Sequence, residues 1–408
     1  MDVLVLSKKF PYPLKDGESI AIDVLSNSMR NQGINLDMLA MNTSKHHADP
    51  KKLDLNNTPY KSLHSVEVNI DLNIKDALLN LFSSDSYHIS RFVSKEYEKK
   101  LISLLKSKPY DIVQLETLYL TPYIDTIRKY SKAKIVLRAH NVEHEIWERI
   151  VSNTTNPIKK IYLQYLVNKL KSYELANIKK IDLLLPISQL DAKKFRSLGY
   201  KGTCLSLPIG IKNKSSLDID TSNYTKPYNI GFIGSLDWIP NQEGLVWFMD
   251  NVWTKFHKKN PKHQLHIAGR NTPEWIKNSN WPSTTIHGEV PSAEAFTTNN
   301  QIMVIPLLSG SGMRAKILEA LSLGRNIVTT SVGVEGIDAQ DLEAVYVADN
   351  AEDFTQHLEN LVQQNGELKR NGQKAKSLIL ERYDSDLIGK RLSDKYRLMI
   401  GTPENVSG

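Results

Sequence analysis

Residues 306–324 have the sequence Pro-Leu-Leu-Ser-Gly-Ser-Gly-Met-Arg-Ala-Lys-Ile-Leu-Glu-Ala-Leu-Ser-Leu-Gly. The apolar run that ends at Ile305 predicts a buried strand, and the apolar spacing after the glycines predicts a helix that stops near Gly324. A strand that enters a helix through a glycine loop is the unit from which doubly wound α/β sheets are built. Because ligands bind such sheets at the carboxyl ends of the strands, this loop is the first candidate site.

The residues of this loop are suited to binding an anion. Gly310 and Gly312 let the backbone approach a ligand closely, and the start of the helix offers unpaired N–H groups. Arg314 lies in the predicted first turn and Lys316 two residues later, so a diphosphate fits the charge. Glu319 follows Lys316 by one turn and is placed to accept hydrogen bonds from ribose hydroxyls. The alternative is a surface network among the three charged side chains.

The strand–helix alternation occurs in two blocks separated by a polar stretch. Each block predicts a parallel sheet covered by helices on both faces, so we expect two doubly wound, Rossmann-like α/β domains. The first block has strands at 2–6, 111–115, 134–138 and 182–187 and a helix at 20–32, and the second has strands at 229–233, 265–268, 301–305 and 326–330 and a helix at 241–259.

These blocks divide the chain of 408 residues as follows. We expect an N-terminal domain over 1–208, a linker over 209–227 and a second domain over 228–378. A helix is expected over 379–400, and 401–408 to form a tail.

The composition is that of an ordinary globular protein, with 40% hydrophobic and 24% charged residues. It excludes a disordered chain, a collagen and a disulfide scaffold, since Cys204 is the single cysteine. No apolar run approaches the roughly 18–20 residues of a membrane span. The start Met1-Asp-Val-Leu-Val-Leu has no basic region of a signal peptide, so we expect a soluble, cytoplasmic protein.

The basic excess is concentrated in residues 157–201, which hold ten basic and three acidic residues. The net charge of this segment, +7, equals that of the whole chain. Such a surface could attract anionic lipid, a phosphorylated acceptor or nucleic acid. Because apolar residues interrupt the basic ones at helical spacing, a solvated helix face is the favoured alternative. Peripheral contact with the inner face of the membrane stays open; a nucleic-acid partner is not expected.

Several segments resemble glycosyltransferase family 4, whose members are retaining sugar-nucleotide transferases with the GT-B fold. The resemblance extends from residue 2 to residue 397 and implies two Rossmann-like domains facing a central cleft. It also implies that the domain over 1–208 is on the acceptor side, that the domain over 228–378 binds the nucleotide sugar and that the helix over 379–400 returns to the N-terminal domain. It is carried by residues 310–324, residues 326–336 (Asn-Ile-Val-Thr-Thr-Ser-Val-Gly-Val-Glu-Gly), residues 231–241 (Gly-Phe-Ile-Gly-Ser-Leu-Asp-Trp-Ile-Pro-Asn), Arg138-Ala-His140-Asn141 and Leu185-Pro-Ile-Ser188.

The chain departs from the family at one of two glutamates that, in many members, are separated by seven intervening residues. The second corresponds to Glu319, but the first position is Ser311. This resembles a branch with Gly-Ser-Gly-x-Arg-x-Lys, in which Arg314 and Lys316 are implied to contact the diphosphate. The backbone N–H groups of Ser311 and Gly312 would take over part of the role of the missing glutamate.

The resemblance implies roles for four further residues. His140, after the strand at 134–138, would face the donor sugar; a partly buried histidine bonded to a backbone carbonyl is the alternative. Gly17 lies in a loop implied to cover the donor phosphates or the acceptor; a turn before a helix capped by Ser19 is equally compatible. Gly234 and Ser235 would leave room for the nucleotide.

The expected function is that of a retaining glycosyltransferase. It would move a sugar from a UDP- or GDP-linked donor to a glycan or lipid-linked acceptor in surface polysaccharide or glycoconjugate synthesis. No cofactor or metal is expected, because the sequence has no zinc-spaced Cys/His set and no Asp-x-Asp. A GT-B sugar-nucleotide epimerase and a non-catalytic partner subunit are the alternatives.

Overall fold

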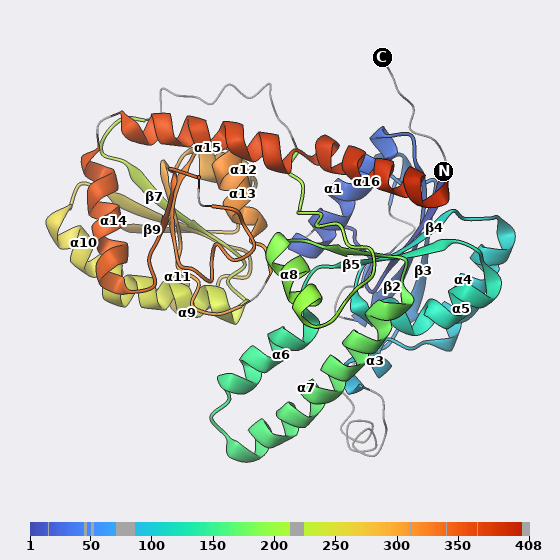
Figure 1. The fold of residues 1–408 in the computed structure, drawn as a ribbon. Helices are drawn as coiled ribbons and strands as arrows, with labels where there is room; N and C mark the ends of the chain where they lie inside the picture. Colours follow the sequence, from blue (N-terminus) through green and yellow to red (C-terminus); the bar gives the residue numbers. More distant parts are fainter. Residues whose placement is uncertain are drawn as a thin grey trace. The chain divides into compact units, whose positions relative to one another are not determined.

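The computed structural model describes residues 1–14, 16–44, 47–49, 53–70, 86–212, 224–310, 312–339, 341–364 and 366–401. The chain forms two compact units, one made of Met1–Gly210 with the chain from Ser385 onward, the other of Ile211–Asp384 (Figure 1). Each unit contains a six-stranded parallel sheet flanked by helices. The predicted α/β class with two doubly wound domains is confirmed.

The first sheet has the strand order β3-β2-β1-β4-β5-β6. Its strands are β1 (Asp2–Ser7), β2 (Asn35–Thr43), β3 (Ser62–Val68), β4 (Ile112–Leu115), β5 (Lys134–Ala139) and β6 (Leu183–Pro186). The helices of this unit are α1 (Gly17–Asn31), α3 (Tyr87–Ser90), α4 (Lys95–Ser107), α5 (Ile124–Tyr130), α6 (Glu143–Ser152), α7 (Pro157–Asn177), α8 (Gln189–Ser197) and α16 (Ser385–Ile400), with 3-10 turns at Leu55–Asn57, Leu118–Tyr123 and Ile178–Lys180.

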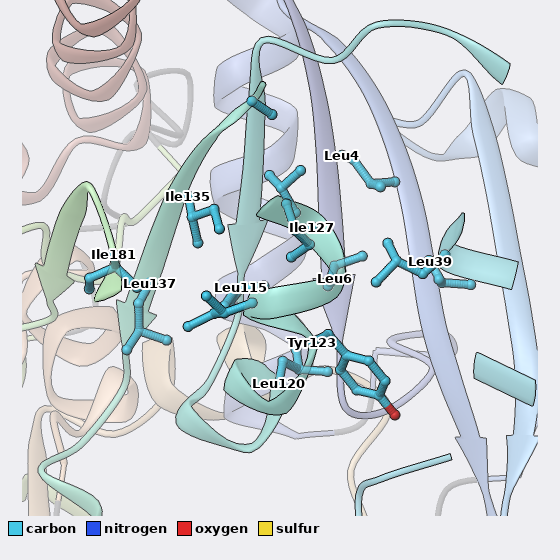
Figure 2. Close-up of a cluster of buried hydrophobic side chains, with 14 of the residues drawn as sticks. Leu4, Leu6, Leu39, Leu115, Leu120, Tyr123, Ile127, Ile135, Leu137 and Ile181 are labelled. Atoms are coloured by element: carbon cyan, nitrogen blue, oxygen red, sulfur yellow. The ribbon is translucent and has the colours of Figure 1, made fainter. Parts of the chain in front are cut away.

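Alternation of side chains along the strands places apolar residues on both faces of this sheet. Figure 2 shows the layer in which Leu6 of β1, Leu115 of β4 and Leu137 of β5 lie beside Ile127 of α5. On the opposite face, strand residues such as Val5 pack in a second cluster with residues of α1 and α16. The central strands are therefore buried on both sides.

The C-terminal helix α16 belongs to the first unit, where it packs against α1. A side chain at Gly389 would lie 2.5 Å from the Ser28 Cβ of α1, so the two helices approach closely. The division between the units lies between Asp384 and Ser385, not at residue 379 as expected from the sequence. Most of the expected linker (213–223) and of the expected tail (402–408) lies outside the described residues.

The second sheet has the strand order β12-β11-β10-β7-β8-β9. Its strands are β7 (Asn229–Ile233), β8 (Gln264–Ala268), β9 (Thr284–Gly288), β10 (Ile302–Ile305), β11 (Asn326–Thr329) and β12 (Val345–Val347). The helices are α9 (Ile239–Phe248), a π-helical turn (Met249–Trp253), α10 (Thr254–Lys259), α11 (Glu274–Lys277), α12 (Ala293–Thr298), α13 (Ala315–Ser322), α14 (Ala351–Gln363) and α15 (Glu367–Tyr383).

The core of the second unit is aromatic. Trp253 is fully buried, and its ring stacks on those of Phe248 and Phe256. The single helix predicted over 241–259 corresponds to α9, the π-helical turn and α10 in succession. Within the described ranges, no helix is both long and apolar enough to cross a membrane.

Candidate functional site

In the second unit, the predicted loops leave two adjacent strands at the same edge of the sheet. β7 and β10 are hydrogen-bonded neighbours, although β8 and β9 come between them in the chain. The strand order therefore reverses here, and such a switch point is where open α/β sheets bind ligands. The loop 234–238 leads from β7 into α9, and the loop 306–314 leads from β10 into α13.

Lys316, on the first turn of α13, is a half-buried cation with uncharged partners. Its Nζ lies 3.1 Å from Asn241 Oδ1 and 3.5 Å from the carbonyl oxygen of Ile233. Burial, and after it the charge of Arg314, lower the pKa of this ammonium group to about 7. An anion placed beside it would stabilise the charged form and raise the pKa again.

Arg314 precedes α13 as its N-cap residue and is not in the first turn as expected. Its guanidinium carbon lies 5.6 Å from the centre of the Trp238 ring, within the range of a cation–π interaction. Gly310 is required here for two reasons. Its φ of 118° is strained for other residues, and a Cβ would lie 2.6 Å from an Arg314 terminal nitrogen. Gly312 also has a positive φ, of 83°.

Asn241, in the first turn of α9, joins the two loops. It accepts from Lys316 and donates to the carbonyl oxygen of Ser235 at 2.8 Å. A Cβ at Gly234 would lie 2.8 Å from Asn241 Nδ2, so this glycine makes room for the amide. Sequence reasoning did not predict this role. A buried amide in the first turn after a candidate loop is the signal that was available.

The structure describes two of the three remaining predicted residues of the second unit. Glu319 is exposed on α13, one turn after Lys316. Ser311 lies outside the described residues. Ser235 donates to Asp237 Oδ1 at 2.5 Å, which orders the loop after β7.

In the first unit, His140 follows β5 and lies against a buried carboxylate. Its Nε2 is 3.1 Å from Glu116 Oε2, at the end of β4, and Arg138 NH1 is 3.5 Å from the same oxygen. Burial acts to raise the pKa of Glu116, but Arg138 and His140 outweigh it and hold that pKa below its usual value. The alternative of a histidine bonded to a backbone carbonyl is therefore wrong, and Glu116 is a site residue that sequence reasoning missed.

The loop after β1 brings further charges to the same edge of this sheet. Glu18 Oε2 lies 3.4 Å from Lys8 Nζ and 3.5 Å from Lys9 Nζ. Burial acts to raise the pKa of Glu18, but Lys8, Lys9 and His140 together lower it. Glu18 therefore lies within electrostatic reach of His140.

Gly17 is the first residue of α1, and Asp16 caps this helix by accepting from the Ser19 N–H at 3.0 Å. The prediction of Ser19 as the cap is therefore wrong. A Cβ at Gly17 would meet no atom within 4 Å, so the position is open.

Immediately after His140, α6 begins at an unusual cap. Glu174 of α7 accepts from the Glu143 N–H at 3.0 Å and from the His144 N–H at 3.2 Å, and it lies 2.6 Å from His144 Nδ1. Burial, with a contribution from Glu174, raises the pKa of Glu143 to about 7. Among the described residues, no group of three or more His, Cys, Asp or Glu side chains could hold a metal ion.

Comparisons with known proteins give a family match within the second unit and a structural match to the two-domain fold. Residues 227–364 match the family Glycosyl transferases group 1. An uncharacterized 44.6 kDa protein in the cps region of Klebsiella pneumoniae is 25% identical over 396 residues, which are 94% of this chain and 96% of that protein.

Solved structures with low identity share the fold over nearly the whole chain. Sucrose-phosphate synthase from Thermosynechococcus elongatus has a TM-score of 0.69 at 13% identity, covering 99% of this chain and 100% of that one. HepE of Anabaena in complex with UDP has a TM-score of 0.65 at 10% identity, covering 97% and 99%. The predicted GT-B fold is thus confirmed, and the match to the family model of glycosyl transferases group 1 falls in the second unit.

Proposed function

We propose that the chain is a retaining glycosyltransferase that moves a sugar from a nucleoside-diphosphate donor to a glycan or lipid-linked acceptor. One observation carries the proposal. The carboxyl edge of β7 and β10 holds a half-buried lysine with a pKa of about 7 beside an arginine, at the start of α13. A diphosphate beside this lysine would stabilise its charged form, and the site lies in the part of the chain that matches the glycosyltransferase family.

The diphosphate of the donor would bind at the start of α13. Arg314 and Lys316 would stabilise the negative charge that grows on the leaving diphosphate, assisted by backbone N–H groups at Gly310 and Gly312. Such preorganised charge is often the largest contribution to catalysis. Ser311, whose side chain lies outside the described residues, would contribute its N–H in the same way.

The nucleotide would bind along the same edge, with Glu319 accepting from the ribose hydroxyls and Gly234 and Ser235 leaving room for the base. We favour a uridine nucleotide. The support is that HepE of Anabaena, with the same fold, has been solved with UDP and with UDP-glucose. No resident cofactor or metal ion takes part in the proposed reaction.

His140 would act on the sugar that is transferred. Glu116 holds its Nε2, which leaves Nδ1 as the ring nitrogen that meets a sugar hydroxyl. In a front-face substitution, the leaving phosphate itself accepts the proton of the acceptor hydroxyl. The sugar–phosphate bond then breaks as the new glycosidic bond forms on the same face, which retains the anomeric configuration.

The acceptor belongs to surface polysaccharide or glycoconjugate synthesis in this proposal. Its support is the relative from the cps region of Klebsiella pneumoniae, which matches 94% of the chain. A GT-B epimerase would instead convert the sugar of the donor with no acceptor present. A non-catalytic subunit would turn over no donor at all.

The proposal is tested by a thermal-shift titration against UDP, GDP, ADP and CMP. A nucleotide that binds only the folded protein raises the melting temperature, and the rise grows with the logarithm of its concentration above the dissociation constant. We expect UDP to shift the wild-type protein and the Arg370→Ala control, which alters an exposed side chain on α15. Arg314→Ala should abolish the shift while leaving the melting temperature without nucleotide unchanged.

Activity is then measured with UDP-sugars and an acceptor extract. Transfer that disappears in Arg314→Ala and persists in Arg370→Ala supports the assignment. A UDP shift that survives in Arg314→Ala, or conversion of a donor to its epimer without acceptor, would overturn it.

A further inference from the structure

Helices α6 and α7 form an antiparallel hairpin that extends away from the sheet of the first unit (Figure 1). The helices are joined by residues 153–156, at the end of the hairpin far from β5. With 21 residues, α7 is about 30 Å long. Figure 1 shows that the N-terminal half of α7, together with α6, extends away from the sheet and the other helices of the first unit.

Two different sides of α7 carry apolar residues. Leu166, Val167 and Leu170 are buried. Leu170 packs in a cluster with residues of α3 and of the 3-10 turn Leu118–Tyr123. Ile158, Ile161 and Tyr165 have a spacing of three and four residues, which places them on one stripe of the helix. They are 81%, 74% and 41% exposed, so this stripe is directed to solvent.

The stripe forms part of an exposed apolar tip. Ile150, in the last turn of α6, is 42% exposed at the same end of the hairpin. Single exposed apolar side chains are common, but neighbouring isoleucines that are three-quarters exposed mark an interaction surface. We define the hairpin tip as residues 150–165.

The charge around the tip is entirely positive. Between Glu148 and Glu174 the chain contains five basic residues, Arg149, Lys159, Lys160, Lys169 and Lys171, and no acidic residue. Lys159 and Lys160 are exposed beside the two isoleucines. Within the described residues, neither forms an ion pair with a carboxylate.

Other basic residues of 157–201 are already engaged elsewhere. Lys171 pairs with Glu148 at 3.2 Å, and Lys194 pairs with Glu145 at 2.6 Å. Arg196 donates to the carbonyl oxygens of Tyr200 and Gly202. At the hairpin tip, unlike at these three residues, exposed lysines occur together with exposed isoleucines.

We propose that the hairpin tip docks onto an anionic lipid bilayer. The isoleucines and Tyr165 enter the boundary between headgroups and acyl chains, and Lys159 and Lys160 contact lipid phosphates. A second copy of the chain fits less well, because a two-fold contact would bring the lysine pairs of both copies together. This docking does not depend on the proposed transferase activity.

The test is co-sedimentation of the full chain with vesicles. One preparation contains equal parts of phosphatidylglycerol and phosphatidylcholine, and the other phosphatidylcholine alone. We expect binding to the anionic vesicles that decreases with added salt, since screening weakens the lysine contribution. Ile158→Ser/Ile161→Ser and Lys159→Gln/Lys160→Gln should each reduce the partition coefficient by about tenfold or more.

Matched controls separate the tip from general charge and hydrophobicity. Lys179→Gln/Lys180→Gln removes the same charge from an exposed pair at the other end of α7, and Val93→Ser removes an apolar side chain that is 57% exposed. Both should bind vesicles as the wild-type protein does. Unchanged melting temperatures and unchanged UDP shifts in the tip variants would show that folding and donor binding are intact.

Two outcomes would overturn the proposal. In the first, the wild-type protein stays in the supernatant when anionic vesicles are sedimented. If the protein also self-associates and Ile158→Ser/Ile161→Ser removes that association, the tip contacts a second copy of the chain instead of a membrane. The other is an equal loss of binding in Lys179→Gln/Lys180→Gln and Lys159→Gln/Lys160→Gln, which would reveal attraction by overall charge alone.

Discussion

Lys316 makes donor binding sensitive to pH near neutrality. Burial and Arg314 lower the pKa of its ammonium group to about 7, so the free protein carries this proton only part of the time. A diphosphate raises that pKa, and binding above pH 7 must therefore take up a proton. We expect affinity for UDP-glucose to be constant well below pH 7 and to fall above it, approaching about tenfold per pH unit.

Isothermal titration calorimetry across this range measures the effect, and UDP-glucose is the suitable ligand because its diphosphate does not titrate near pH 7. Lys316→Gln cannot titrate and should bind weakly with a pH-independent affinity. An equally flat profile in the wild-type protein would contradict the role given to Lys316.

Gly310 sets the position of the Arg314 guanidinium. A methyl group at residue 310 would lie 2.6 Å from a terminal nitrogen of that side chain and 3.3 Å from the Trp238 ring. Gly310→Ala should therefore weaken UDP binding by about tenfold or more, since a charge-assisted contact contributes about 1.5–3 kcal/mol. The readout is the UDP-dependent thermal shift.

Gly288→Ala is the matched control for this substitution. Its φ of 66° is also positive and therefore also unfavourable for alanine, but a Cβ there meets no atom within 4 Å. Equal losses of UDP affinity in both variants would mean that strain, and not the displacement of Arg314, is responsible.

At the level of single residues, the loop 306–314 could be predicted from the local sequence, but the side chains that bind the candidate site residues could not. Glycines and cations at a strand–helix junction are visible in the sequence itself. The Glu116 carboxylate and the Asn241 amide gain their roles from neighbours 24 and 75 residues away in the chain. Such pairings arise from sheet topology, which short-range patterns do not contain.

Among the elements, the central strands were predictable because apolar residues predominate in them, whereas β2, β3, β9 and β12 were not predicted. In β2, Asp37 interrupts the apolar run although the whole strand interior is buried. Its carboxylate is satisfied by Lys108 at 2.6 Å and by the Tyr110 hydroxyl at 2.9 Å. A distant segment thus makes a polar residue compatible with a buried strand.

The hairpin of α6 and α7 depends on the cap that Glu174 forms at the start of α6. Glu174→Ala would leave two backbone N–H groups and His144 Nδ1 without their buried acceptor. Breaking a buried pair costs about 3 kcal/mol or more, so the melting temperature of the first unit should fall by about 5–10 °C.

Glu148→Ala is the control on the same hairpin, because its pair with Lys171 is substantially exposed. Exposed pairs contribute about 0–1 kcal/mol, and the melting temperature should change by no more than about 3 °C. A similar fall in both variants, measured by scanning calorimetry, would argue against a special role for the cap.

For the whole molecule, the first unit is discontinuous in the chain and the second is not. Ile388, Leu392 and Tyr396 of α16 are buried in the first unit, and the Tyr396 hydroxyl donates to Gln114 Oε1 at 2.6 Å. Burying three such side chains contributes about 6 kcal/mol, a large share of a typical domain's stability.

Deleting the chain after Asp384 should therefore abolish or strongly lower the melting transition of the first unit. The second unit, Ile211–Asp384, should keep its own transition and its UDP-dependent shift. Calorimetry of the truncated protein with and without UDP distinguishes the two units, and two unchanged transitions would contradict the division.

The place of α16 also affects the order in which the protein can be completed during synthesis. When Gly210 leaves the ribosome, α16 has not yet been synthesised, and the surface of the first unit against which it packs is exposed to solvent. At about 5–20 residues per second, the helix follows after about 10–40 s. During this interval the second unit can fold as an uninterrupted segment, while the first unit exposes an apolar surface on which a chaperone can act.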